Sequence, residues 1–138
     1  MKALILDDDS LLADLMETVV GGLYPGVDIF VTASVRSALM HWSEHGSDLM
    51  IIDWNLPDGS GLEVVRTVRE KSRETIIVMV SGRADRDSVL KAARHGINGY
   101  ISKPFDQSEL QGILEKALRT GQANANTLHE DDVGRFEI

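Results

Sequence analysis

The chain contains 138 residues, of which 43% are hydrophobic and 26% are charged, and its formal net charge is -8. These proportions are typical of one globular domain and exclude wholesale disorder, and the acidic balance argues against direct nucleic-acid binding. The apolar runs of about five residues are too short to span a membrane, no signal peptide is recognisable, and the lack of cysteine excludes disulfides and thiolate metal sites. We therefore expect a cytoplasmic protein.

The first half of the chain alternates between the apolar spacing of strands and that of helices. A strand is predicted at residues 3–6, followed by a helix over 11–20 that Gly21-Gly22 should end. A shorter and more mixed strand is predicted at 28–32, and a second helix should end near Gly46.

The second half of the chain repeats this alternation three times. Strands are predicted at 49–52, 76–80 and 100–102, and helices at 62–71, 89–95 and 110–120, the last ending at Gly121. The first two of these strands are apolar throughout, as is typical of parallel strands covered by helices on both faces.

Strands that alternate strictly with helices predict an α/β fold built from right-handed βαβ units. We expect a flavodoxin-like, five-stranded parallel sheet in the order 2-1-3-4-5, with five flanking helices. The mixed composition of residues 28–32 favours an edge position for the second strand. Residues 1–120 should form one domain, and residues 121–138, which are small, polar and acidic, a tail or linker.

Polar residues follow four of the five predicted strands, at the point where each strand ends. Asp7-Asp8-Asp9, Asp53, Ser81 and Lys103 occupy these positions. Because parallel strands bring their carboxyl ends to the same edge of a sheet, we expect these side chains to form one pocket.

The residue types of this pocket point to magnesium and a phosphoryl group. Two carboxylates about 4 Å apart repel by ~4 kcal/mol at an effective dielectric constant of about 20, so the clustered aspartates need a cation. With only oxygen ligands and no nearby Cys or His, Mg²⁺ is favoured over zinc. The Asp53 carboxylate can attack phosphorus to form an aspartyl phosphate, while Lys103 and Ser81 hold the oxygens of the transferred group.

Several short motifs stand in a family-specific order. They are Asp7-Asp8, the run Asp53-Trp54-Asn55-Leu56-Pro57 with Gly61, the pair Ser81-Gly82, and Tyr100 followed by Lys103-Pro104-Phe105. With these motifs, residues 2–119 resemble the receiver domain of bacterial two-component response regulators, of the chemotaxis-type single receiver fold.

The resemblance implies a phosphorelay signalling domain that is phosphorylated on Asp53 by a histidine kinase or a phosphotransfer protein. It implies that Asp7, Asp8, Asp53 and the backbone carbonyl of Asn55 bind Mg²⁺ as the cofactor. Such a domain is not an enzyme beyond its own Mg²⁺-dependent phosphorylation and dephosphorylation. It would act through an output domain or on a target protein.

The same resemblance implies further roles. Ser81 would follow the phosphoryl group and Lys103 would bridge to it, and the ring of Tyr100 would turn inward, which changes the surface of the fourth helix, fifth strand and fifth helix. Arg83 would lean over the phosphoryl oxygens and tune their hydrolysis, and the bond before Pro104 would be cis. The plainer alternatives are a Tyr100 fixed in the core and an Arg83 that is simply solvated.

The row of aspartates also allows other interpretations. Asp9 is expected to cap the helix that follows it. Asp7 and Asp9 also fit the nucleophile and general acid of a haloacid-dehalogenase-like phosphatase. That alternative leaves Asp53 unexplained, and the only later acidic pair is Asp131-Asp132 in the tail.

One further pair of residues could face a metal ion together. His41 and His45 stand one helical turn apart, but no third ligand accompanies them. A partly exposed helix face is the better interpretation.

Overall fold

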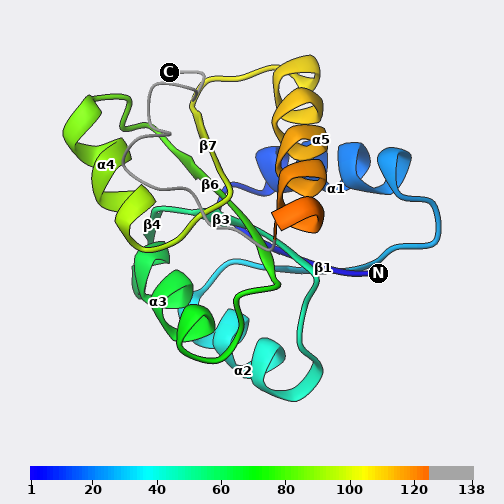
Figure 1. Ribbon diagram of the computed structural model, residues 1–138, viewed down its shortest axis with the longest axis horizontal. Helices are drawn as coiled ribbons and strands as arrows, with labels where there is room; N and C mark the ends of the chain where they lie inside the picture. The colour runs from blue at the N-terminus through cyan, green and yellow to red at the C-terminus, as the bar shows by residue number, and fades with distance from the viewer. Residues whose placement is uncertain (125–138) are drawn as a thin grey trace.

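The computed structural model describes residues 1–124, which fold as a parallel sheet between two layers of helices (Figure 1). The elements, in chain order, are β1 (Lys2–Leu6), α1 (Ser10–Leu23), β2 (Asp28–Thr32), α2 (Val35–His45), β3 (Leu49–Asp53), β4 (Asn55–Leu56), β5 (Gly59–Ser60), α3 (Gly61–Lys71), β6 (Ile76–Ser81), α4 (Arg86–Arg94), β7 (Gly99–Ser102) and α5 (Gln107–Asn124). Within residues 1–124, no helix has the length and apolar character needed to cross a membrane.

The five main strands pair in parallel in the order β2-β1-β3-β6-β7. This confirms the predicted flavodoxin-like order, because β6 and β7 are the fourth and fifth strands of the sheet. β2 lies at one edge and keeps Asp28 and Val31 exposed, as its mixed composition predicted. The short strands β4 and β5, which the apolar pattern did not predict, form a separate antiparallel hairpin after β3.

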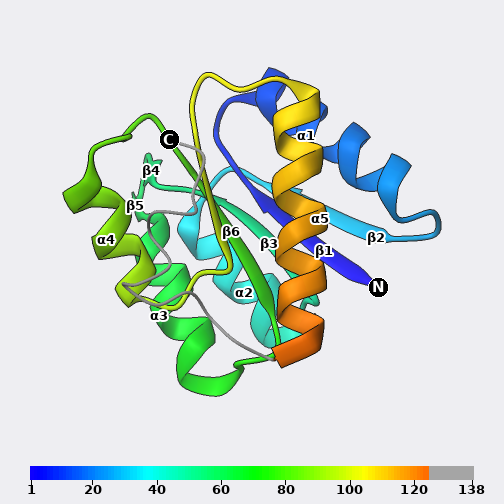
Figure 2. The same ribbon diagram turned by 45° about the horizontal axis from the view of Figure 1, so that its top comes forward.

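Two apolar cores lie on opposite faces of the sheet. Helices α1 and α5 cover one face, and α2, α3 and α4 cover the other (Figure 2). Alternate residues of a strand point to opposite faces, so in β3 Leu49 and Ile51 join the first core whereas Met50 and Ile52 join the second. All four side chains are 0% exposed, which explains why this run had to be apolar throughout.

The first helix does not end at Gly21-Gly22, so that prediction was wrong. α1 continues to Leu23, which packs against the core beneath α1 and α5 and so gives the helix a reason to extend. The turn comes at Gly26, whose φ of 87° lies in the left-handed region that glycine adopts readily.

The last helix likewise passes through Gly121 and reaches Asn124, so its predicted end was also wrong. Gly121 lies against β6: a Cβ atom there would stand 2.0 Å from Cδ1 of Ile76. This glycine therefore lies in the contact between α5 and the sheet and does not stop the helix. The remainder of the predicted tail, residues 125–138, lies outside the described residues.

Aspartates accept hydrogen bonds from backbone N–H groups at several helix starts, Asp9 and Asp58 among them. Oδ1 of Asp9 accepts hydrogen bonds from the backbone N–H groups of Leu11 and Leu12, which confirms its predicted role as the cap of α1. Asp58, in the β4–β5 hairpin, instead reaches across to α2 and accepts from the N–H groups of Val35 at 2.8 Å and Arg36 at 3.1 Å.

We predict that Asp58→Asn lowers the melting temperature at neutral pH. The hydrogen bonds from Arg36 and Val35 hold the pKa of Asp58 below its ordinary value of 3.8, so the charged cap stabilises the fold above that pH and loses this effect as the pH falls through the lowered pKa. The difference between wild type and variant should therefore shrink as the pH is taken below 3.8 in thermal unfolding experiments. Asp14→Asn, on the exposed side of α1, is the control. A difference that does not change with pH would contradict the charged cap.

Candidate functional site

The register of the sheet brings the four predicted strand-end residues to one edge. Asp53 ends β3 and pairs with the residue before Ser81, and Ser81 pairs with the residue before Lys103. On the other side of β3, the residue before Asp7 pairs with the residue before Asp53. The predicted pocket therefore forms at the carboxyl edge of β1, β3, β6 and β7.

Three carboxylates converge at this edge. Asp7, Asp8 and Asp53 each offer a carboxylate oxygen, and these atoms lie within 4.8 Å of one another. Asp7 and Asp53 are only 3% and 6% exposed, whereas Asp8 is open to solvent. Such a cluster is unfavourable unless positive charge accompanies it.

Asp7 is the most buried of these three carboxylates. Its Oδ1 accepts a hydrogen bond from the N–H of Asp9 at 2.8 Å, but its Oδ2 is buried and accepts no hydrogen bond. Burial, helped by the neighbouring charge of Asp53, raises the pKa of Asp7 despite the backbone hydrogen bond and Lys103. A buried, unsatisfied carboxylate oxygen beside two further carboxylates fits a hard divalent cation such as Mg²⁺.

Lys103 supplies the positive charge found at the cluster. Its Nζ donates a hydrogen bond to Oδ2 of Asp53 at 3.1 Å and lies 3.4 Å from Oδ2 of Asp7. Burial pulls the pKa of Lys103 down, but the Asp53 and Asp7 carboxylates outweigh burial and raise it. The ammonium group therefore stays charged, one cation among three acids. The peptide bond from Lys103 to Pro104 is cis.

Ser81 and Tyr100 hold the same piece of backbone. The buried Oγ of Ser81 accepts a hydrogen bond from the N–H of Arg83 at 2.9 Å. The hydroxyl of Tyr100 donates to the carbonyl oxygen of Arg83. The Tyr100 ring is 0% exposed and lies inward in this structure.

The side chain of Arg83 contacts the two residues that follow Asp53. Its guanidinium lies 4.6 Å above the ring of Trp54, and Nη2 donates to Oδ1 of Asn55 at 3.4 Å. The indole face attracts the cation, so Arg83 rests on the residue next to Asp53. Sequence spacing could not predict this contact, because 29 residues separate the two partners along the chain.

Gly61 is a residue of the site region for which the sequence analysis found no physical role. Its N–H donates to the carbonyl oxygen of Trp54 at 2.7 Å. A Cβ atom at this position would stand 2.0 Å from the carbonyl oxygen of Asp53 and 2.7 Å from Cγ2 of Ile52. The start of α3 thus packs directly on the backbone of Asp53, which only glycine allows.

The two histidines lie away from this edge. His41 stacks on Phe30, with ring centroids 3.7 Å apart, and His45 lies 4.5 Å from His41. Of the residues that the structure describes, only the aspartate cluster gathers three potential metal ligands. The interpretation of His41 and His45 as a partly exposed helix face is confirmed.

Comparisons with known proteins agree with this geometry. The sequence profile of the response regulator receiver domain matches residues 3–115. The chain is 32% identical to the chemotaxis protein CheY of Pseudomonas aeruginosa, over 84% of this chain and 94% of that protein. It is 33% identical to the KDP operon transcriptional regulatory protein KdpE of Escherichia coli, over 88% of this chain but only 53% of that protein. The chain thus spans about half the length of KdpE.

Solved structures agree as well. The receiver domain of Francisella response regulator 1452 superimposes with a TM-score of 0.74 at 25% identity, covering 86% of this chain and 98% of that one. None of these similarities supports the phosphatase alternative, and Asp9, its general acid, is engaged as a helix cap. The acidic pair Asp131-Asp132 lies outside the described residues.

We predict that Gly61→Ala destabilises the fold by ~1–3 kcal/mol, because the added methyl group overlaps backbone atoms of Asp53 that cannot rotate away. Gly112→Ala, in α5, is the matched control: its Cβ would meet nothing within 4 Å, so the variant should be unchanged or up to about 1 kcal/mol more stable. Urea unfolding measures both free energies. Equal stabilities of the two variants would show that the contact seen at Gly61 is not tight.

Proposed function

The chain is a receiver domain of the two-component response regulator family, and we propose that Asp53 is its phosphoacceptor. The observation that carries this proposal is the position of the Asp53 carboxylate. It lies at the carboxyl edge of the sheet, nearly buried, where it accepts a hydrogen bond from the ammonium group of Lys103 and lies beside the carboxylates of Asp7 and Asp8. A carboxylate with a charged donor and a candidate cation site next to it suits nucleophilic attack on phosphorus.

In the proposed reaction, one carboxylate oxygen of Asp53 attacks the phosphorus of a phosphohistidine on a histidine kinase or phosphotransfer protein. The bond between phosphorus and the imidazole nitrogen breaks, and the nitrogen keeps the electron pair. Lys103, already within hydrogen-bond distance of Asp53, holds the phosphoryl oxygens after transfer. The chain's own catalysis is limited to this phosphorylation and to the hydrolysis that reverses it.

We further propose that Asp7, Asp8, Asp53 and the backbone carbonyl of Asn55 hold Mg²⁺. When bound, Mg²⁺ offsets the mutual repulsion of the carboxylates and the charge on the transferring phosphoryl oxygens. The buried Oδ2 of Asp7 supports this assignment, because it accepts no hydrogen bond and has the ammonium group of Lys103, 3.4 Å away and shared with Asp53, to offset its charge.

The proposed output is a change in the segment that leads from β6 to α4. When the hydroxyl of Ser81 moves to donate a hydrogen bond to a phosphoryl oxygen, it displaces the N–H of Arg83, from which it accepts. Tyr100 holds the carbonyl of the same Arg83, so the change passes to β7 and to the start of α4. The surface of α4, β7 and α5 would thus have two arrangements, and an output domain or target protein would recognise one of them.

The function is tested by phosphorylation with a small acyl phosphate in the presence of Mg²⁺. Wild type should gain one phosphoryl group and Asp53→Asn none, as mass spectrometry of the intact chain reports. Asp8→Ala should lose most of the Mg²⁺-induced change in Trp54 fluorescence, whereas Asp14→Ala, on the exposed side of α1, should keep it. Peptide mapping that placed the phosphoryl group on Asp7 would refute the assignment.

Arg83 is proposed to lengthen the life of the phosphorylated form. By resting on Trp54 and Asn55 it restricts the approach of water to Asp53 from that side. A contact of this kind is worth about 0.5–1 kcal/mol, so Arg83→Ala should hydrolyse roughly two to five times faster. The half-life is measured by following loss of the phosphoryl group. Arg86→Ala, which removes the same charge from the exposed start of α4, should leave it unchanged, and equal rates in both variants would reject the role of the stack.

A further inference from the structure

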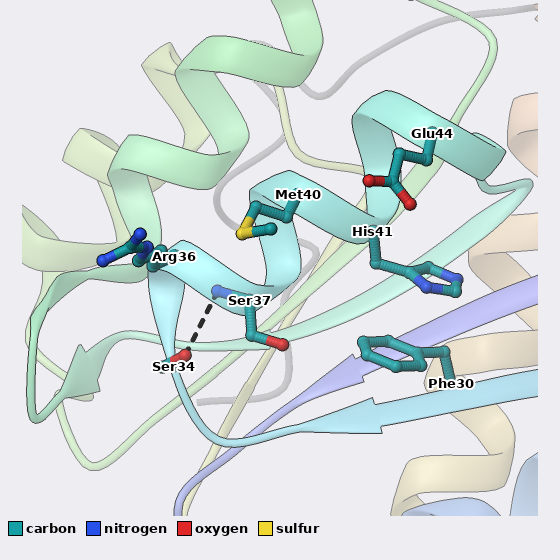
Figure 3. A pocket seen from close by; sticks show the side chains of 7 residues that line it. All are labelled: Phe30, Ser34, Arg36, Ser37, Met40, His41 and Glu44. Atoms are coloured by element: carbon teal, nitrogen blue, oxygen red, sulfur yellow. Dashed lines mark hydrogen bonds between the residues drawn. The ribbon is translucent and has the colours of Figure 1, made fainter.

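A hollow of about 410 Å³ lies beside α2, next to the β2 edge of the sheet (Figure 3). It is separate from the aspartate cluster: none of its lining residues belongs to the four strand-end positions. Its floor includes the stacked rings of Phe30 and His41, which are 3.7 Å apart and within 2° of parallel. β2 has a neighbouring strand on one side only, so this flank of the sheet is uncovered in the described part of the chain.

Three side chains of α2 form a stripe along this hollow. Arg36, Met40 and Glu44 are spaced four residues apart, so they lie on the same side of the helix (Figure 3). All three are exposed, and Met40, in the middle, is 54% exposed. The stripe therefore has a cation at one end, an apolar thioether at its centre and an anion at the other end.

Within residues 1–124, the charges of this stripe are not neutralised by close ion pairs with buried or bidentate geometry. Over residues 1–124, no carboxylate lies within ion-pair distance of the Arg36 guanidinium. Glu44 has only its neighbour His45, at 3.7 Å and with both side chains more than half exposed. Arg36 and Glu44 lie eight residues apart, about 12 Å along the helix, so they do not satisfy each other.

From this pattern we propose that the outer face of α2 docks a second copy of this chain through a two-fold axis at Met40. Arg36 and Glu44 are equally distant from Met40, so an antiparallel pair of α2 helices sets each Arg36 opposite the Glu44 of the other copy. A parallel pair would instead set Arg36 against Arg36. The charge pattern therefore favours a partner that carries the complementary stripe, and it favours the antiparallel orientation of the two α2 helices.

Met40 and the hollow complete the fit. An exposed methionine on the axis is placed to enter the hollow beside the opposite helix, where the flat stack of Phe30 and His41 offers apolar surface. Methionine is flexible and makes favourable contacts with aromatic rings, which suits this position. The contact is small and its ion pairs are solvated, so the dimer is weak and depends on concentration. It leaves the α4, β7 and α5 surface free, because β2 and β7 are opposite edges of the sheet.

The lack of cysteine in the chain permits a direct test by thiol cross-linking. A short bis-maleimide is the suitable reagent, because it joins two thiols across the contact without the strict geometry that a disulfide needs. Met40→Cys should form a covalent dimer at least tenfold faster than Arg66→Cys, a matched control at an exposed position in the middle of α3. Equal rates for the two variants would overturn the proposal and leave this face to a different partner.

Charge reversal in the Met40→Cys background tests the pairing itself. Arg36→Glu alone and Glu44→Arg alone should each slow cross-linking severalfold, because each sets like charges against each other in both pairs. A mixture of the two variants should restore heterodimer cross-linking, since both pairs are then opposite in sign. If the mixture cross-links no faster than the separate variants, the antiparallel arrangement is wrong. Neither experiment requires phosphorylation, so its outcome is independent of the role proposed for Asp53.

Discussion

Asp7 and Asp53 are buried side by side at the carboxyl edge of the sheet, with the single ammonium group of Lys103 between them. The parallel topology forces this proximity, because every strand delivers the residue that follows it to the same edge. One cation does not balance two buried acids and the exposed Asp8. This surplus of negative charge is the physical basis for the proposed binding of a hard cation, which would also offset the charge of an incoming phosphoryl group.

Arg83 connects this site with β6, β7 and the residue that follows β3. Ser81 accepts the hydrogen bond of its N–H, Tyr100 donates to its carbonyl oxygen, and its side chain lies on Trp54 beside Asp53. One short segment is therefore held from β6, from β7 and from the end of β3. A change in the hydrogen bond of Ser81 cannot remain local, because the other two contacts share the same residue and α4 begins three residues later.

The site also has a connection towards the other edge of the sheet. The hairpin of β4 and β5 follows Asp53 directly, and its Asp58 holds the first turn of α2. Gly61 then brings the start of α3 onto the backbone of Asp53. The segment after Asp53 is thus fixed at both ends by contacts that span distant parts of the chain, which keeps the position of the Asp53 carboxylate well defined.

Much of this architecture was predictable from the sequence because it depends on local periodicity. Runs such as residues 76–80, which are apolar at every position, predicted buried strands. The polar residues that follow the predicted strands, Asp53 and Lys103 among them, predicted where the pocket lies. What the sequence left undecided depends on contacts between residues far apart along the chain. Gly121 looked like a helix end but lies against Ile76, and Asp58 caps α2 from a hairpin that the apolar pattern did not predict. Arg83 had a motif position but no visible partner until the fold placed Trp54 beneath it. The apolar period that predicts a strand or helix depends on residues close together in the sequence. The contacts of a particular side chain form only when the folded sheet brings distant segments together.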